Sequence, residues 1–169
     1  DEETRALCSR YMDLIEKRAS RIPLQQLTGT QGFMGLEFKV NEHVLIPRQD
    51  TEILVELVLK EQTDREKTVL DVCTGSGCIA VSLAALGGYK QVTALDISKE
   101  ALKVAEENAG GLLGEYKGSF RLLESDMFSG LKHEDSFDVI VSNPPYIPTK
   151  VIEGLEPEVR DFEPRLALD

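Results

Sequence analysis

Residues 71–80 read Asp71-Val72-Cys73-Thr74-Gly75-Ser76-Gly77-Cys78-Ile79-Ala80, and they join a short β-rich run to an apolar helix. The run covers residues 68–73, and we expect the helix to continue to about Leu86. Gly75 and Gly77 allow the backbone to turn sharply and to approach a ligand without a Cβ in the way. A strand, a glycine turn and a helix in this order predict an α/β unit that binds a ligand at its turn.

The alternation of strand and helix continues downstream of the glycine turn. Residues 91–97 form a second predicted strand, Ser98 is a good N-cap, and 99–108 form a second helix. Third and fourth strands are predicted at 120–125 and 137–142. Alternating buried strands and amphipathic helices predict a mostly parallel sheet with helices on both faces, and ligands bind such sheets at the carboxyl ends of the strands.

The residues before the glycine turn predict three smaller elements. Residues 3–18 place apolar side chains on one helical face, and Pro23 ends this helix. Residues 32–40 are rich in β-formers and predict a hairpin. Residues 45–52 lead into another helix, with Asp50 or Thr51 as its N-cap. The face of the first helix comprises Leu7, Tyr11, Leu14 and Ile15, and the buried stripe of the last comprises Ile53, Leu54, Leu57 and Val58.

Composition excludes several classes of protein. The chain is 41% hydrophobic with a net charge of -11, an ordinary globular balance without the dense basic run that phosphate binding favours. No apolar run approaches membrane-spanning length. An odd count of cysteines, Cys8, Cys73 and Cys78, favours reduced thiols in a cytoplasmic protein. Because no histidine or second cysteine pair completes a site, no metal is expected.

Acidic residues end the second and third predicted strands. Asp96 can accept hydrogen bonds from both hydroxyls of a ribose, and Ile97 follows it. Asp126 could accept from the exocyclic amine of adenine, and Met127 could cover the adenine face. Each feature alone has a plain alternative: a connecting glycine turn, a surface acid or a core methionine. Together with Thr74, Gly75, Ser76 and Gly77 they favour a nucleoside ligand.

The spacing Gly75-x-Gly77-x-x-Ala80 also fits a dinucleotide fingerprint, so the turn alone does not distinguish the two kinds of ligand. Asp71, shortly before the turn, favours a cationic aminoacyl sulfonium, as in S-adenosylmethionine. A pyrophosphate would instead favour an uncharged approach to the helix N-terminus.

The fourth predicted strand ends in Asn143-Pro144-Pro145-Tyr146. The two prolines fix the backbone, so the Pro144 carbonyl can point outward beside the Asn143 side-chain oxygen. Two convergent acceptors suit a planar –NH2 group, and Tyr146 can pack flat against it. Holding such a nitrogen in line with a methyl sulfonium is catalysis by positioning and a preorganised polar environment. The plain alternative is a proline-rich turn.

These motifs resemble those of the HemK/PrmC family, the protein-(glutamine-N5) methyltransferases that act on peptide chain release factors. Residues 71–80 resemble its cofactor loop, and 143–146 match its catalytic tetrapeptide. Residues 45–52 resemble its leucine-isoleucine-proline-arginine-proline-aspartate-threonine-glutamate signature, and 163–168 resemble a further segment. DNA adenine and RNA guanine methyltransferases share the tetrapeptide, whereas the Pro47-Arg48 segment is more discriminating.

The resemblance implies a class I S-adenosylmethionine-dependent methyltransferase domain at 48–169, preceded by the end of a helical domain at 1–22 and a hairpin linker at 23–47. It implies methyl transfer from S-adenosylmethionine, leaving S-adenosylhomocysteine, to the glutamine of the Gly-Gly-Gln loop of a release factor. Asn143 and Pro144 would hold the amide, and Asn143 would also contact the cofactor. Asp96 would hold the ribose, and the Gly75–Gly77 backbone would line the methionine part.

Two departures from the family pattern matter. Gln49 stands where the family usually has proline, and this could loosen the approach to the following helix. The family also continues beyond residue 169, so we expect the chain to be truncated, with its C-terminal strands missing. The fourth strand would then be an open edge at which the chain could self-associate.

Three alternatives stay open at this point. A nucleic-acid amine methyltransferase, acting on adenine N6 or guanine N2, would need a basic groove, and the sequence shows no dense run of basic residues that predicts one. A nucleotide-binding or NAD-dependent module would leave residues 143–146 without a role. A truncated chain could bind cofactor or partner without turnover.

Overall fold

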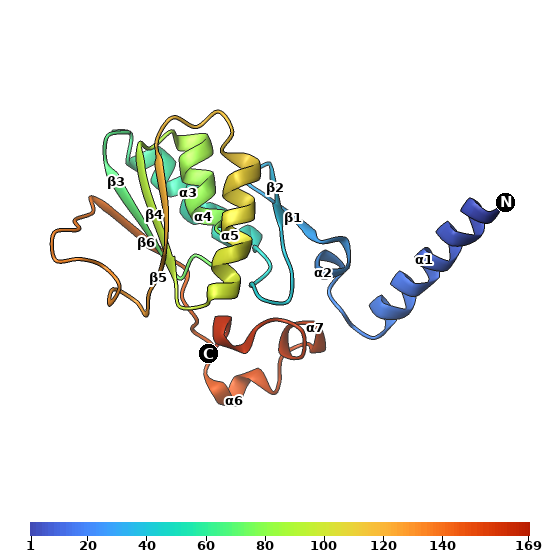
Figure 1. Ribbon diagram of the computed structural model, residues 1–169. Coiled ribbons are helices and arrows are strands. Elements are labelled where there is room, and N and C mark those ends of the chain that lie inside the picture. Colours follow the sequence, from blue (N-terminus) through green and yellow to red (C-terminus); the bar gives the residue numbers. More distant parts are fainter.

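The computed structural model describes residues 1–169 and contains one parallel sheet of four strands in the order β5-β4-β3-β6 (Figure 1). The strands are β3 (Thr68–Val72), β4 (Gln91–Asp96), β5 (Ser119–Glu124) and β6 (Val139–Ser142). The register places Asp71 opposite Ala94 on one side and Val141 on the other. The prediction of an α/β chain with four parallel strands is therefore confirmed.

Three helices cover one face of this sheet: α3 (Gln49–Glu61), α4 (Cys78–Ser82) and α5 (Lys99–Leu112), with a π-helical turn at Leu83–Gly87 continuing α4. The prediction of helices on both faces is not met within these residues, because no helix lies between β5 and β6. Leu131 and Phe137 of that connection pack instead on the small cluster of Leu70, Val72 and Leu95.

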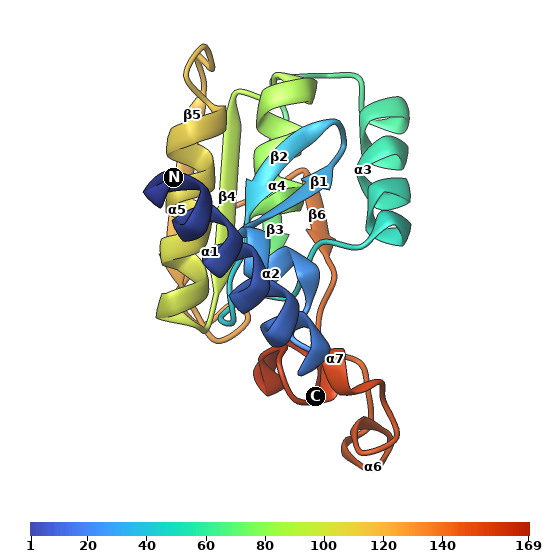
Figure 2. The same ribbon diagram turned by 90° about the vertical axis from the view of Figure 1, so that its right-hand side faces the viewer.

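The hairpin of β1 (Thr30–Phe33) and β2 (Leu36–Lys39) lies against the helical layer, as Figure 2 shows from the side. Phe33 and Phe38 are almost fully buried and meet edge to face, with ring centroids 6.0 Å apart. They belong to the main core cluster, together with Val69 of β3 and with Val81 and other residues of α4. The predicted hairpin is confirmed, and it forms part of the core.

Helix α3 differs from the prediction in its N-cap residue and in the side chains that it buries. Its N-cap is Arg48, without a side-chain capping bond, so neither Asp50 nor Thr51 is the cap. Val55 and Val58 are buried, whereas Ile53 and Leu57 are 64% and 54% exposed. Residues 53–59 are apolar at almost every position, so helical periodicity alone could not fix which side faces α4.

Helix α5 confirms the predicted cap and extends the predicted helix. The Ser98 side chain accepts a hydrogen bond from Ala101 N–H at 3.2 Å, as an N-cap does. The helix continues past Gly110 and Gly111 to Leu112. Its buried Ala101, Val104 and Ala105 face the core side of the molecule.

The end of the N-terminal helix and the residues after it contact the C-terminal segment beside the sheet. Helix α1 (Glu2–Ala19) projects outward without a buried residue, and α2 (Leu24–Thr28) follows Pro23. Residues 147–169 carry α6 (Thr149–Ile152), α7 (Pro157–Arg160) and a 3-10 turn at Arg165–Ala167, and they lie below the carboxyl ends of the strands. Arg18 and Arg21 form ion pairs with Glu158 of this segment, and Gln26 Nε2 donates to Phe162 O at 2.8 Å.

Two further findings bear on partners. None of the helices is long and apolar enough to cross a bilayer. Strand β6 pairs with β3 alone, and Ile140 on it is 56% exposed. Self-association through this edge stays a prediction.

Candidate active site

The glycine turn between β3 and α4 has the backbone geometry that its composition predicts. Gly75 and Gly77 have φ values of +57° and +80°. A Cβ added to Gly77 would lie 3.1 Å from the Cβ of Ala105 on α5, so glycine also permits close packing there. Thr74 N–H donates to Leu95 O at 2.9 Å, which ties the turn to the end of β4.

Asp71 lies beneath this turn and not at its surface. Its side chain is fully buried, and one carboxylate oxygen accepts from Thr74 Oγ1 at 2.6 Å and from Ala80 N–H at 3.2 Å. Burial raises the pKa of Asp71 to about 7, although these two hydrogen bonds act in the opposite direction. Asp71 therefore supports the turn from below. Its side chain does not line the cavity, and its contact with the cofactor stays a prediction.

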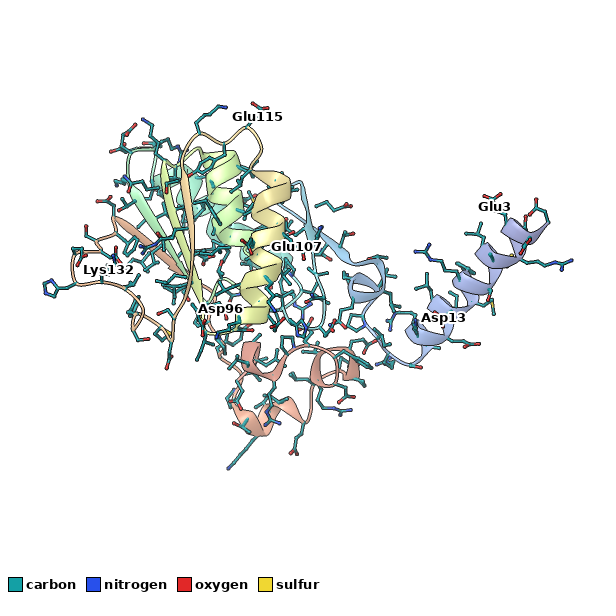
Figure 3. All side chains as sticks on the ribbon, viewed as in Figure 1. Glu3, Asp13, Asp96, Glu107, Glu115 and Lys132 are labelled. Atoms are coloured by element: carbon teal, nitrogen blue, oxygen red, sulfur yellow. The ribbon has the colours of Figure 1, made fainter.

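Asp96, at the end of β4, is held on both oxygens by backbone N–H groups. Oδ2 accepts from Gly75 at 2.8 Å, and Oδ1 accepts from Ser98 at 2.9 Å. Each carboxylate oxygen keeps a second lone pair. Figure 3 labels Asp96 at the carboxyl end of the sheet, beside residues 147–169. The residue thus combines a fixed position with free acceptor capacity.

The end of β5 is shaped by Ser125. Its hydroxyl donates to Met127 O at 2.6 Å and accepts from Gly130 N–H at 2.8 Å, which closes a tight turn. Met127 has a φ of +48° and a half-exposed side chain. Asp126 and Met127 both face the cavity described next.

These strand ends surround one cavity of about 260 Å³. Its lining contains most of the predicted site residues, and it excludes Asp71, Gly77, Pro144 and Tyr146. The predicted residues in the lining are Thr74, Gly75, Ser76, Asp96, Ile97, Asp126, Met127, Asn143 and Pro145. The lining also contains the apolar residues Leu95 and Ile79, and apolar surface with carboxylates at two strand ends fits an adenosine-like group.

Asn143 follows β6 and borders this cavity from the side opposite Asp126. Its Nδ2 lies 3.4 Å from Thr51 Oγ1, a long hydrogen bond that leaves Oδ1 as the free acceptor. Pro144 is exposed, and Tyr146 is 78% exposed. Tyr146 borders a second hollow of about 290 Å³. The two hollows share Leu45, Arg48, Thr51, Asn143 and Ala167. The tetrapeptide therefore stands between two hollows.

The structure adds lining residues that the sequence had not assigned to the site. The loop after the hairpin contributes His43, Val44 and Leu45, and the C-terminal segment contributes Pro164, Leu166, Ala167 and Asp169. Arg48 donates from Nη2 to both oxygens of Glu163, at 2.9 and 2.7 Å. The sequence signal for these residues was the resemblance of segments 45–52 and 163–168 to motifs of the family. Neither segment had been given a role in the site.

Comparison with known proteins agrees with this geometry. The family model described as methyltransferase small domain matches residues 48–154. This range contains the glycine turn, Asp96, Asp126 and Asn143.

Curated relatives are similar over nearly the whole chain. A protein named release factor glutamine methyltransferase from Geobacter sulfurreducens is 47% identical over 92% of this chain and 53% of its own length. Proteins of the same name from Moorella thermoacetica and Leptospira interrogans are 48% and 46% identical, over 100% and 94% of this chain. They confirm the resemblance predicted from the motifs. The chain spans between 53% and 59% of the length of these three relatives.

Solved structures support the fold. A methyltransferase from Agrobacterium tumefaciens, titled as dependent on SAM, matches with a TM-score of 0.55 at 22% identity, over 69% of this chain and 39% of that one. The 16S rRNA N2 G1207 methyltransferase of T. thermophilus matches with a TM-score of 0.52 at 22% identity, over 71% and 33%. At these identities the likeness concerns the fold, which is the class I methyltransferase fold.

Proposed function

The chain belongs to the methyltransferase small domain family, and we propose that it carries the active site of an enzyme that methylates the glutamine of the Gly-Gly-Gln motif in peptide chain release factors. The observation that carries this proposal is the position of Asn143. Its amide borders both the cavity at the strand ends and the second hollow, so a group in one hollow can reach a group in the other.

The cavity at the strand ends fits S-adenosylmethionine. Asp96, oriented by two backbone N–H groups, accepts the ribose hydroxyls, and Asp126 and Met127 border the adenine. Thr74, Gly75 and Ser76 line the methionine part. When bound, this cofactor supplies the electrophilic methyl group. Asp71 acts only through the turn that it supports.

The second hollow receives the glutamine side chain. Asn143 Oδ1 accepts one N–H of the amide, because Nδ2 is turned toward Thr51. The Pro144 carbonyl accepts the other, and Tyr146 packs on the planar group. These contacts hold the nitrogen in place and increase its electron density, so that positioning and a preorganised environment account for the catalytic effect.

The names of the relatives and the charge of the chain support a protein substrate. Three relatives of 46–48% identity are named release factor glutamine methyltransferase. A net charge of -11 is poorly suited to phosphate binding. A release factor acts in the cytoplasm, and we place the enzyme in the same compartment.

Calorimetric titration with S-adenosylhomocysteine tests the cofactor half of the proposal. We expect micromolar affinity for the wild type and roughly 10- to 100-fold weaker binding for Asp96→Ala. A loss of this size follows when hydrogen bonds to a charged acceptor are removed. Asp135→Ala is a matched control, because Asp135 lies in the connection between β5 and β6 outside the cavity. Affinity for NAD without affinity for S-adenosylhomocysteine would contradict the proposal.

Methyl transfer to a release factor tests the substrate half. Asn143→Ala should lose most of its turnover, and its affinity for S-adenosylhomocysteine should fall less than that of Asp96→Ala, because Asn143 only borders the cofactor cavity. Unchanged turnover in this variant would show that Asn143 has no role in the reaction.

A further inference from the structure

Five residues line both hollows: Leu45, Arg48, Thr51, Asn143 and Ala167. The three polar ones, Arg48, Thr51 and Asn143, are called the shared wall. A substrate amide at this wall would meet an acceptor in Asn143 Oδ1. The proposed contacts of Asn143 and Pro144 account for its –NH2 group, and they leave its carbonyl oxygen without a donor.

Arg48 is a donor with unused capacity at this wall. Its Nη2 donates to both oxygens of Glu163, whereas Nε and Nη1 contact no acceptor in the structure. The Arg48 side chain is 43% exposed and the Glu163 side chain only 1%. The guanidinium is therefore anchored on one edge and open on the other, and its planar shape fixes where the free donors point.

The charge of the pair indicates what kind of acceptor fits. Burial raises the pKa of Glu163, and the guanidinium of Arg48 opposes this shift. Both oxygens of Glu163 accept from Arg48, so this pair already compensates the positive charge of the guanidinium, and a second anion at the open edge would lie close to the Glu163 carboxylate. A neutral carbonyl oxygen needs only the free N–H groups.

We infer that Arg48 binds the carbonyl oxygen of the primary carboxamide whose nitrogen Asn143 holds, and that Glu163 is a positioning residue that keeps Arg48 at the wall. This inference rests on the proposed function. A primary carboxamide presents a donor and an acceptor side by side, and the wall presents their complements from Asn143 and Arg48. Arg48 thereby selects carboxamides, whereas Asn143 alone accepts any planar amine.

Arg48→Lys tests the role of the free donors. Lysine keeps a positive charge opposite Glu163 and lacks the open edge of the guanidinium. We expect the KM for the release factor to rise roughly tenfold with kcat little changed, because the lost contact is made in both ground and transition states. The affinity for S-adenosylhomocysteine and the melting temperature should stay near the wild-type values. Arg165→Lys is the matched control, since Arg165 lies in the same segment as Glu163 and lines neither hollow.

The role of Glu163 is tested by a double-mutant cycle. Glu163→Gln should also raise the KM, and the double variant with Arg48→Lys should be scarcely worse than Arg48→Lys alone, because Glu163 acts through Arg48. Independent, additive effects of the two substitutions would overturn the positioning role. A merely structural ion pair would lower the melting temperature and leave the KM unchanged.

Three further outcomes would overturn the inference, and they can be told apart. Weaker binding of S-adenosylhomocysteine to Arg48→Lys would assign Arg48 to the carboxylate of the cofactor. An active wild type whose KM is insensitive to Arg48→Lys would refute the carbonyl contact while leaving the proposed function intact. A wild type that binds S-adenosylhomocysteine and neither binds nor methylates a release factor would refute the proposed function and this inference together.

Discussion

Asn108 provides a test of how the cofactor loop is held in place. Its side chain on α5 is 2% exposed and joins three elements. Oδ1 accepts from Lys39 N–H at 2.7 Å, and Nδ2 donates to Lys39 O at 3.0 Å and to Ser76 O at 2.8 Å. One amide therefore connects the hairpin, the glycine turn and α5.

Asn108→Ala removes all three hydrogen bonds and leaves their backbone partners beside a small void. At about 1 kcal/mol net for each bond, we expect the free energy of unfolding to fall by about 3 kcal/mol. For a chain of this size the melting temperature should fall by roughly 6–12 °C. Because Ser76 lines the cavity, the dissociation constant of S-adenosylhomocysteine should also rise several-fold.

Urea unfolding followed by circular dichroism and calorimetric titration measure the two effects. Asn41→Ala is the matched control: Asn41 Oδ1 accepts only from His43 N–H, at 2.9 Å in an exposed loop, so its loss should cost about 1 kcal/mol or less. If Asn108→Ala costs no more than this control, the three contacts do not brace the loop. If it costs the expected energy and leaves cofactor affinity unchanged, Asn108 stabilises the fold without positioning Ser76.

Three other substitutions have outcomes that the structure predicts. Gly77→Ala should lower the free energy of unfolding by about 1–3 kcal/mol, because the φ of Gly77 is +80° and the new Cβ would lie 3.1 Å from that of Ala105. Urea unfolding measures this loss. Gly88→Ala is the control: its φ is +68°, its new Cβ would meet open space, and it should cost less and leave cofactor binding unchanged. Asp71→Asn should flatten the pH dependence of stability between about pH 4 and 7: the folded carboxyl, with a pKa of about 7, binds its proton more tightly than the unfolded one, so wild-type stability falls as pH rises through this window. A variant with the same slope as the wild type would count against the burial of Asp71. Phe38→Ala should lower the free energy of unfolding by about 3–5 kcal/mol in chemical unfolding, because it removes a fully buried ring that meets Phe33 edge to face. A loss below about 1 kcal/mol would show that the hairpin is not part of the core.

The sequence predicted the sheet well because its signals are local. Strands β3, β4 and β6 are segments of four to six residues rich in Val, Ile and Leu, and Ser98 caps the helix that it precedes. Glycines at positions 75 and 77 have the positive φ values that their turn requires. Each of these features depends on neighbours within a few residues along the chain.

Features that depend on distant contacts could not be predicted in the same way. The buried side of α3 is decided by packing on α4, and residues 53–59 are apolar almost throughout. The depth of Asp71 follows from the central place of β3 between β4 and β6. The ion pair of Arg48 with Glu163 joins residues 115 positions apart, so only the folded chain brings them together.

Tandem mass spectrometry of a release factor, incubated with the protein and S-adenosylmethionine, tests the central claim most directly. The account predicts one added methyl group, located on the side-chain amide of the glutamine in the Gly-Gly-Gln motif and absent when Asn143→Ala replaces the wild type. A release factor that stays unmodified, while the same preparation binds S-adenosylhomocysteine and methylates adenine or guanine in nucleic acid, would contradict it.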